Sequence, residues 1–174
     1  MSRVLDDALS KSIYTYIRHR WQNTFPGVAR SSELIPSPYV YTTPNTLGTG
    51  LNHLFYWDTY FANVALIHTG EMARARANVD ALIHLLNLTG FVPNINVPRG
   101  DNRSQTPYLS HMIRDIYLKS RRAEYLRTRE IALHNEYLFW MTERAGPYGL
   151  NRYWHNADDE YLLRFYDDVL VPRL

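Results

Sequence analysis

Apolar residues recur at every fourth position near the start of the chain, and a related spacing continues through most of its length. The first run consists of Leu5, Leu9, Ile13, Ile17 and Trp21. Residues four positions apart lie on one face of a helix, so this run predicts an amphipathic helix that ends near Pro26. A chain with this spacing folds mainly as helices.

Two further runs predict a pair of helices joined by a very short connection. The run that begins at Leu54 stops at Gly70, and the run that begins at Met72 stops at Gly90. Glycine is common just after the last residue of a helix, because it adopts the left-handed conformation without strain. Since almost nothing lies between the two runs, they predict an αα-hairpin.

Three more helices are expected in the second half of the chain. Thr106 is a suitable N-cap with Pro107 at the first helical position, and Asp158 is a suitable N-cap for the last helix. The expected ranges are about 107–120, 123–144 and 159–169.

Residues 28–53 differ from the rest, because prolines and glycines interrupt any helix there and no strand alternation replaces it. We expect a long ordered loop in this range. The predicted fold class is therefore all-α. The chain has 174 residues, of which 45% are hydrophobic, and it suits a single domain over 1–174 with a packed core.

Charge and cysteine content exclude several classes of function. The formal net charge is +2 and the basic residues are scattered, which argues against nucleic acid or a membrane surface as partners. The absence of cysteine excludes disulfides, thiolate nucleophiles and cysteine-bound zinc. The histidines lack the spacing of a helical zinc site, so we expect no metal and no cofactor. No segment has the pattern of a signal peptide or a membrane span, which favours a cytoplasmic location.

Three blocks combine aromatic and polar side chains that suit a neutral, hydroxyl-rich ligand. They are residues 55–61, 91–94 and 102–107, with the candidate side chains Trp57, Asp58, Asn94, Arg103 and Gln105. An indole can cover the C–H face of a sugar ring, while carboxylate, amide and guanidinium groups bind its hydroxyls. We expect these five side chains to converge on one concave end. The alternative is that Asp58 and Arg103 pair as an internal salt bridge.

The three blocks resemble, in order and spacing, those of the trehalase family of glycoside hydrolases. The family reads Tyr-Tyr-Trp-Asp-Ser-Tyr-Phe, then Ile-Pro-Asn-Gly-Asn, then Arg-Ser-Gln-Pro-Pro. The match runs from about residue 45 to Trp154 and implies the earlier part of an (α/α)6 toroid, built from antiparallel helix pairs. It also implies an inverting hydrolase of trehalose or a related α-glucoside. The substrate-binding residues implied by the resemblance are Trp57, Asp58, Asn94, Arg103, Ser104 and Gln105.

Glycoside hydrolysis needs two carboxyl groups, one that protonates the leaving oxygen and one that activates water. The acid and base of the family lie in later motifs than those matched here, so we assign no catalytic residue. The family uses the position of Asp58 to bind glucose hydroxyls. The acidic cluster from Asp158 to Glu160 is interpreted as a helix N-terminus, where carboxylates are favourable. We therefore expect the chain to be a fragment or a shortened form that is inactive alone.

Two departures from the family pattern leave the exact substrate open. Gly50 lies near the position of an expected sugar-binding arginine, and residues 155–160 replace an Arg-Pro-Glu-Ser motif. A non-catalytic sugar-binding protein and a helical scaffold without a ligand remain as alternatives. An incomplete ring would leave apolar helix faces without neighbours, so we also expect self-association or a further segment of chain to cover them.

Overall fold

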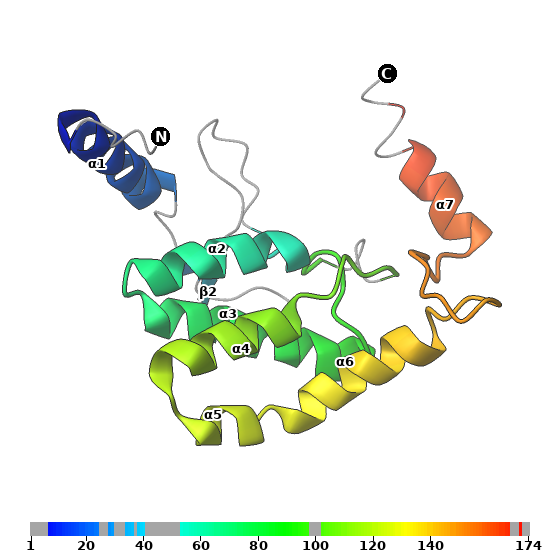
Figure 1. Ribbon diagram of the computed structural model, residues 1–174. Coiled ribbons are helices and arrows are strands. Elements are labelled where there is room, and N and C mark those ends of the chain that lie inside the picture. Colours follow the sequence, from blue (N-terminus) through cyan, green and yellow to red (C-terminus); the bar gives the residue numbers. More distant parts are fainter. Residues whose placement is uncertain are drawn as a thin grey trace.

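The computed structural model describes residues 7–24, 28–29, 34–36, 38–40, 53–97, 102–167 and 171. Within these ranges the regular secondary structure is helical apart from one short strand pair, and irregular segments connect the elements (Figure 1). Its elements are α1 (Asp7–Thr24), β1 (Val28–Ala29), β2 (Tyr39–Val40), α2 (Tyr56–His68), α3 (Met72–Thr89), α4 (Leu109–Ser120), α5 (Ala123–Arg127), α6 (Glu130–Thr142) and α7 (Asp159–Phe165). The predicted all-α class is confirmed. None of the described helices has the length and apolar character needed to cross a membrane.

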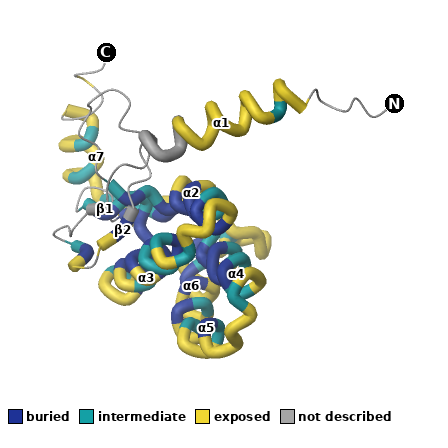
Figure 2. The backbone as a smooth tube through the Cα atoms, turned by 90° about the vertical axis from the view of Figure 1, so that its left-hand side faces the viewer, coloured by how far each residue is buried: buried dark blue, intermediate teal, exposed yellow. Residues whose placement is uncertain are grey.

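The helix α3 lies at the centre of the helical body. It packs against α2, α4, α6 and β2. Leu82, Leu85 and Leu86 point into these contacts and are fully buried. Figure 2 shows buried positions where α2, α3, α4 and α6 lie together. Each buried leucine contributes about 1.5–3 kcal/mol relative to an exposed one, so these side chains of α3 contribute to the apolar stabilisation of the core.

The predicted hairpin is confirmed, and α2 and α3 run antiparallel (Figure 1). The amide of Glu71 donates to the carbonyl of Leu66 at 2.7 Å, and the amide of Gly70 donates to that of Ile67 at 3.3 Å. These two bonds form a Schellman motif, which requires a left-handed residue after the helix. Gly70 has φ of 86°, so a glycine is favoured at this turn.

A pair of buried amides joins the same two helices. Asn63 donates from Nδ2 to the carbonyl of Ala75 at 3.1 Å, and Asn78 donates from Nδ2 to Oδ1 of Asn63 at 2.9 Å. Both asparagines are buried, so a shift in the register of α2 against α3 would leave polar groups unpaired in the core. The pair therefore fixes how the hairpin packs.

The start of α4 differs from the prediction. The helix begins at Leu109 and not at Pro107, and Tyr108 occupies the N-cap position predicted for Thr106. The physical reason is a long-range contact, because the amide of Leu109 donates to the hydroxyl of Tyr56 at 2.9 Å. A buried tyrosine from another helix thus takes the role predicted for a local threonine cap.

The single helix predicted over 123–144 is also wrong, because residues 128–129 divide it into α5 and α6. The hydroxyl of Thr128 donates to the carbonyl of Glu124 at 3.0 Å and competes with regular helix geometry. Arg129 pairs with Asp80 of α3 at 2.5 Å and lies 3.8 Å from the ring centroid of Tyr125. These contacts favour a break where Arg129 meets α3.

The predicted first helix is present as α1, and its apolar residues Leu9, Ile13 and Ile17 are exposed. Figures 1 and 2 show α1 extending away from the helical body. Leu5 and the side chain of Trp21 lie outside the described residues. The exposed face agrees with the expectation of an uncovered apolar surface, whereas the expected self-association stays a prediction.

The prediction of a long loop without strands over 28–53 is wrong for the residues that form β1 and β2. Val28 pairs with Val40, and Ala29 with Tyr39, in a short antiparallel ladder. Residues 41–52, which include Gly50, lie outside the described residues.

Shortening a buried side chain of α3 tests whether this helix lies at the centre of the core. Leu82→Ala should lower the free energy of unfolding by about 2–5 kcal/mol, because it leaves a cavity at a fully buried position. Leu88→Ala in the same helix is the matched control, since Leu88 is 56% exposed and its loss should cost no more than about 0.5 kcal/mol. Urea unfolding followed by circular dichroism measures both. Equal losses would show that α3 is not the central helix.

Candidate functional site

The first amide groups of α2 are capped by residues from two distant segments. A helix leaves its first amides without intrahelical partners, and Phe55 at the N-cap offers no side-chain acceptor. The amide of Tyr56 donates to the carbonyl of Asn94 at 3.2 Å. The amide of Trp57 donates to Oε1 of Gln105 at 2.9 Å. The second and third sequence blocks therefore meet the first block at the N-terminus of this helix.

Backbone contacts join these segments further. The amide of Asn94 donates to the carbonyl of Arg103 at 2.8 Å, and Phe55 forms an antiparallel bridge with Ile95. Asn96 accepts from the amide of Leu54 at 2.8 Å through Oδ1. Three segments far apart in sequence thus form one connected surface.

A small hollow lies on this surface. It has a volume of about 170 Å³, and its lining residues are Trp57, Gln105, Thr106 and Tyr153. The side chain of Trp57 is 45% exposed there, although a tryptophan is usually well buried. An indole left open beside an amide and a hydroxyl suits a ligand that has both C–H faces and hydroxyl groups.

The sequence-predicted side chains take different positions around this hollow. Trp57 and Gln105 line it, whereas Asp58 is exposed in the first turn of α2. Because Oε1 of Gln105 already accepts the Trp57 amide, its Nε2 group is the part that can serve a ligand. Asn94 is half-buried and joins the site through its backbone.

Arg103 and Ser104 make contacts within the chain. Arg103 donates from Nη1 to Oδ1 of Asn102 at 3.0 Å and lies 5.4 Å from the ring centroid of Phe165. No ion pair joins Arg103 to Asp58, both of which belong to the described residues, so the salt-bridge alternative is not observed. Ser104 is buried, and its hydroxyl donates to the carbonyl of Gln105 at 3.0 Å.

A buried tyrosine and glutamate below this surface were missed by sequence reasoning. Tyr56 donates from its hydroxyl to Oε1 of Glu136 in α6 and accepts from the amide of Leu109 in α4. Burial raises the pKa of Glu136 to about 7, although the hydrogen bond from Tyr56 opposes this effect. Burial, followed by the nearby Glu136, raises the pKa of Tyr56 well above its usual value. No sequence pattern pairs two residues that are 80 positions apart.

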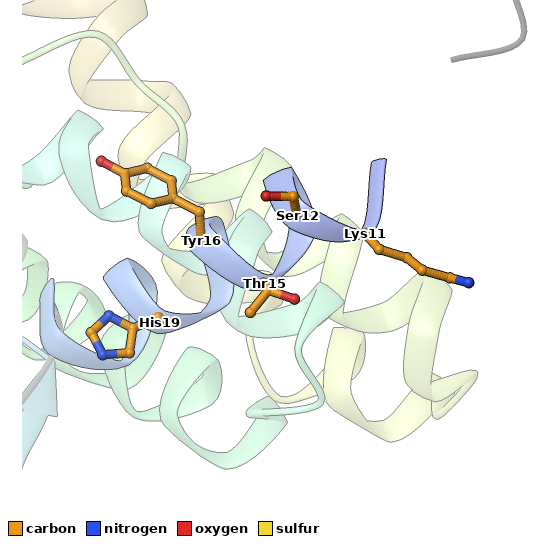
Figure 3. A pocket seen from close by; sticks show the side chains of 5 residues that line it. All are labelled: Lys11, Ser12, Thr15, Tyr16 and His19. Carbon is orange, nitrogen blue, oxygen red and sulfur yellow. The ribbon is translucent and has the colours of Figure 1, made fainter. Parts of the chain in front are cut away.

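Two larger hollows do not form candidate sites. One of about 510 Å³ is lined only by residues of α1, and Figure 3 shows that their side chains point in different directions from that single helix. Side chains of one exposed helix cannot enclose a ligand. The other hollow, of about 380 Å³, lies between α3 and α6 and contains none of the predicted binding residues.

The acidic cluster near the end of the chain has a structural role. Asp158 accepts at Oδ1 from the amide of Tyr161 at 2.7 Å, and Glu160 pairs with Arg164 at 2.5 Å. The interpretation of Asp158 as a helix cap is confirmed. Over the residues that the structure describes, no three histidine or acidic side chains are grouped as a metal site would require.

Comparison with known proteins gives a consistent result. A family model described as trehalase matches residues 3–169. A periplasmic trehalase from Pseudomonas aeruginosa is 30% identical over 156 residues, which cover 81% of this chain and 28% of the relative. A trehalase from Bombyx mori is 30% identical and matches 82% of this chain and 23% of its own length. The chain therefore spans less than a third of these relatives.

A solved structure is similar as well. The neutral trehalase from Saccharomyces cerevisiae matches with a TM-score of 0.62 and 26% sequence identity. The match covers 78% of this chain and 26% of the yeast chain. The α/α toroid predicted from the sequence is therefore supported by structure as well as by sequence.

The stability of the chain should fall as the pH rises from about 4.5 to about 7, because burial raises the pKa of Glu136 from 4.5 to about 7. In this window the unfolded carboxyl group has lost its proton and the folded one retains it. The contribution of Glu136 to the free energy of unfolding is complete below about pH 4.5 and is lost as the pH passes through 7. It amounts to at most about 3 kcal/mol.

Urea unfolding between about pH 4 and pH 8 measures this dependence. Glu136→Gln should remove the contribution of this group. Glu130→Gln, which changes an exposed carboxylate in the first turn of the same helix, should leave it in place. If the free energy of unfolding changed with pH in the same way in the wild type and in Glu136→Gln, the pH dependence would not come from Glu136.

Proposed function

The chain belongs to the trehalase family, and on this basis we propose that it forms the sugar-binding end of an inverting glycoside hydrolase. The proposed substrate is trehalose or a related α-glucoside. One observation carries the proposal: the segments with Trp57, Asn94 and Gln105 meet at the N-terminus of α2 beside an exposed indole. The relatives reported above are themselves trehalases by name.

In the proposed complex each side chain serves a different part of the sugar. The ring of Trp57 covers the C–H face, and the carboxylate of Asp58 accepts hydrogen bonds from hydroxyl groups. Nε2 of Gln105 and the guanidinium of Arg103 donate to sugar oxygens. The amide of Asn94 can both donate and accept. Ser104 supports the site from within the protein, because its buried hydroxyl already donates to the backbone carbonyl of Gln105.

The N-terminus of α2 strengthens this arrangement. Asp58 lies in the first turn, where the partial positive charge of the helix stabilises a carboxylate. A charged acceptor forms stronger hydrogen bonds to hydroxyl groups than a neutral one. Asp58 is therefore proposed as the main polar anchor for the sugar.

We assign the described residues a role in binding the sugar and none in proton transfer. An inverting glycosidase places two carboxyl groups about 6.5–9.5 Å apart across the bond that is cleaved. None of the residues that line the hollow carries a carboxyl group. Glu136 is buried against Tyr56, and Asp158 caps α7. The proposed hydrolysis therefore needs an acid and a base in addition to this surface.

The 174-residue chain should bind trehalose weakly and should not cleave it. We expect a millimolar dissociation constant, or about 4 kcal/mol of binding free energy, measured by calorimetric titration. Asp58→Asn should weaken binding at least about tenfold, because a hydrogen bond to a charged group contributes about 1.5–3 kcal/mol. Asp159→Asn, an exposed acid in the first turn of α7, is the matched control and should bind as the unchanged chain does.

Two outcomes would contradict the proposal. Binding that is equal in Asp58→Asn and in the control would remove Asp58 from the site. Release of glucose from trehalose by the purified chain would mean that an acid and base pair is already present.

A further inference from the structure

A turn after α6 brings residues 151–156 back beside the third block. Asn151 forms an antiparallel bridge with Ala145, and the amide of Arg152 donates to the carbonyl of Arg144 at 2.7 Å. Further along, His155 forms an antiparallel bridge with Arg103. The segment is therefore attached at both ends.

Tyr153 lies between these two attachments and lines the hollow with Trp57, Gln105 and Thr106. Partial burial raises the pKa of the Tyr153 hydroxyl, and the nearby guanidinium of Arg103 opposes this effect. The candidate polar group Arg103 thus lies near the same tyrosine. The hollow has an aromatic ring from α2 and a second one from the segment after α6.

The neighbours of Tyr153 make ring contacts, whereas Tyr153 makes none with the residues that the structure describes. Trp154 stacks on His155 with centroids 5.2 Å apart, and the guanidinium of Arg152 lies 4.9 Å from the Trp154 ring. Over the described part of the chain, Tyr153 makes neither a ring stack nor a hydrogen bond, and its side chain is 59% exposed. Its ring and hydroxyl are available to a ligand in the hollow.

We propose that Tyr153 is a second aromatic wall of the sugar site and a binding residue for the same ligand as Trp57. The inference rests on the function proposed above and adds a residue to it. The ring of Tyr153 would contact C–H groups of the sugar that Trp57 does not reach. A hollow of about 170 Å³ is small, so both rings would contact the same sugar unit.

Arg144 attaches the segment that carries Tyr153 to α6. Its side chain is only 1% exposed, and Nη1 donates to Oδ1 of Asn156 at 3.1 Å. Its guanidinium also lies 4.5 Å from the ring centroid of Phe139 in α6. The backbone amide of Asn156 in turn donates to the backbone carbonyl of Asn102 at 2.7 Å. Arg144 therefore connects α6 to the segment that carries Tyr153 and to the third block.

Calorimetric titration of the 174-residue chain with trehalose tests the inference. Tyr153→Ala should weaken binding roughly tenfold, the loss expected for one aromatic contact. Tyr153→Phe keeps the ring and should bind within about twofold of the unchanged chain. Tyr148→Ala is the matched control, because Tyr148 is 90% exposed on the same turn and does not line the hollow. Thermal unfolding shows whether each variant remains folded.

The outcomes separate this inference from the proposed function. If Trp57→Ala abolishes binding while Tyr153→Ala binds as tightly as Tyr148→Ala, the sugar site stands and Tyr153 is not part of it. If the unchanged chain does not bind trehalose at any accessible concentration, both the proposed function and the role of Tyr153 are wrong. A loss in Tyr153→Ala that Tyr153→Phe restores would establish the aromatic wall.

Discussion

The capping of α2 by two distant segments is the contact on which the candidate site depends. Phe55 cannot cap the helix, so the carbonyl of Asn94 and the side chain of Gln105 take the first two amides. A helix cap contributes about 0.5–2 kcal/mol, and here it also brings three sequence blocks together. The helix start and the candidate site consequently form together, because the same hydrogen bonds stabilise both.

The first turn of α2 also presents one side chain to the core and the next one to the hollow of the candidate site. Successive residues of a helix point about 100° apart, so Tyr56 and Trp57 face different surroundings. Tyr56 is buried and reaches both α4 and the protonatable Glu136 of α6, whereas Trp57 remains open to the hollow.

Local patterns predicted the elements that depend on local contacts. The spacing of apolar residues predicted α2 and α3, glycine predicted their ends, and Asp158 predicted the start of α7. The start of α4 and the break before α6 could not be predicted, because the Tyr56 hydroxyl and the pairing of Arg129 with α3 determine them. Of the side chains predicted from the sequence blocks, Trp57 and Gln105 line the hollow, and their role in binding stays a prediction. Tyr153 and the inward side chain of Ser104 became visible only once the chain was folded.

Amide-resolved NMR of the labelled chain during titration with trehalose is the most direct test of this account. We predict that the largest shifts fall on the amides of Trp57, Asp58, Asn94 and residues 103–105, with a smaller set at Tyr153, because these groups surround one connected surface. The amides of the buried helix α3 should remain unchanged. Shifts confined to α1 or α7, or a uniform pattern over all helices, would contradict the claim that the capped end of α2 is the sugar site.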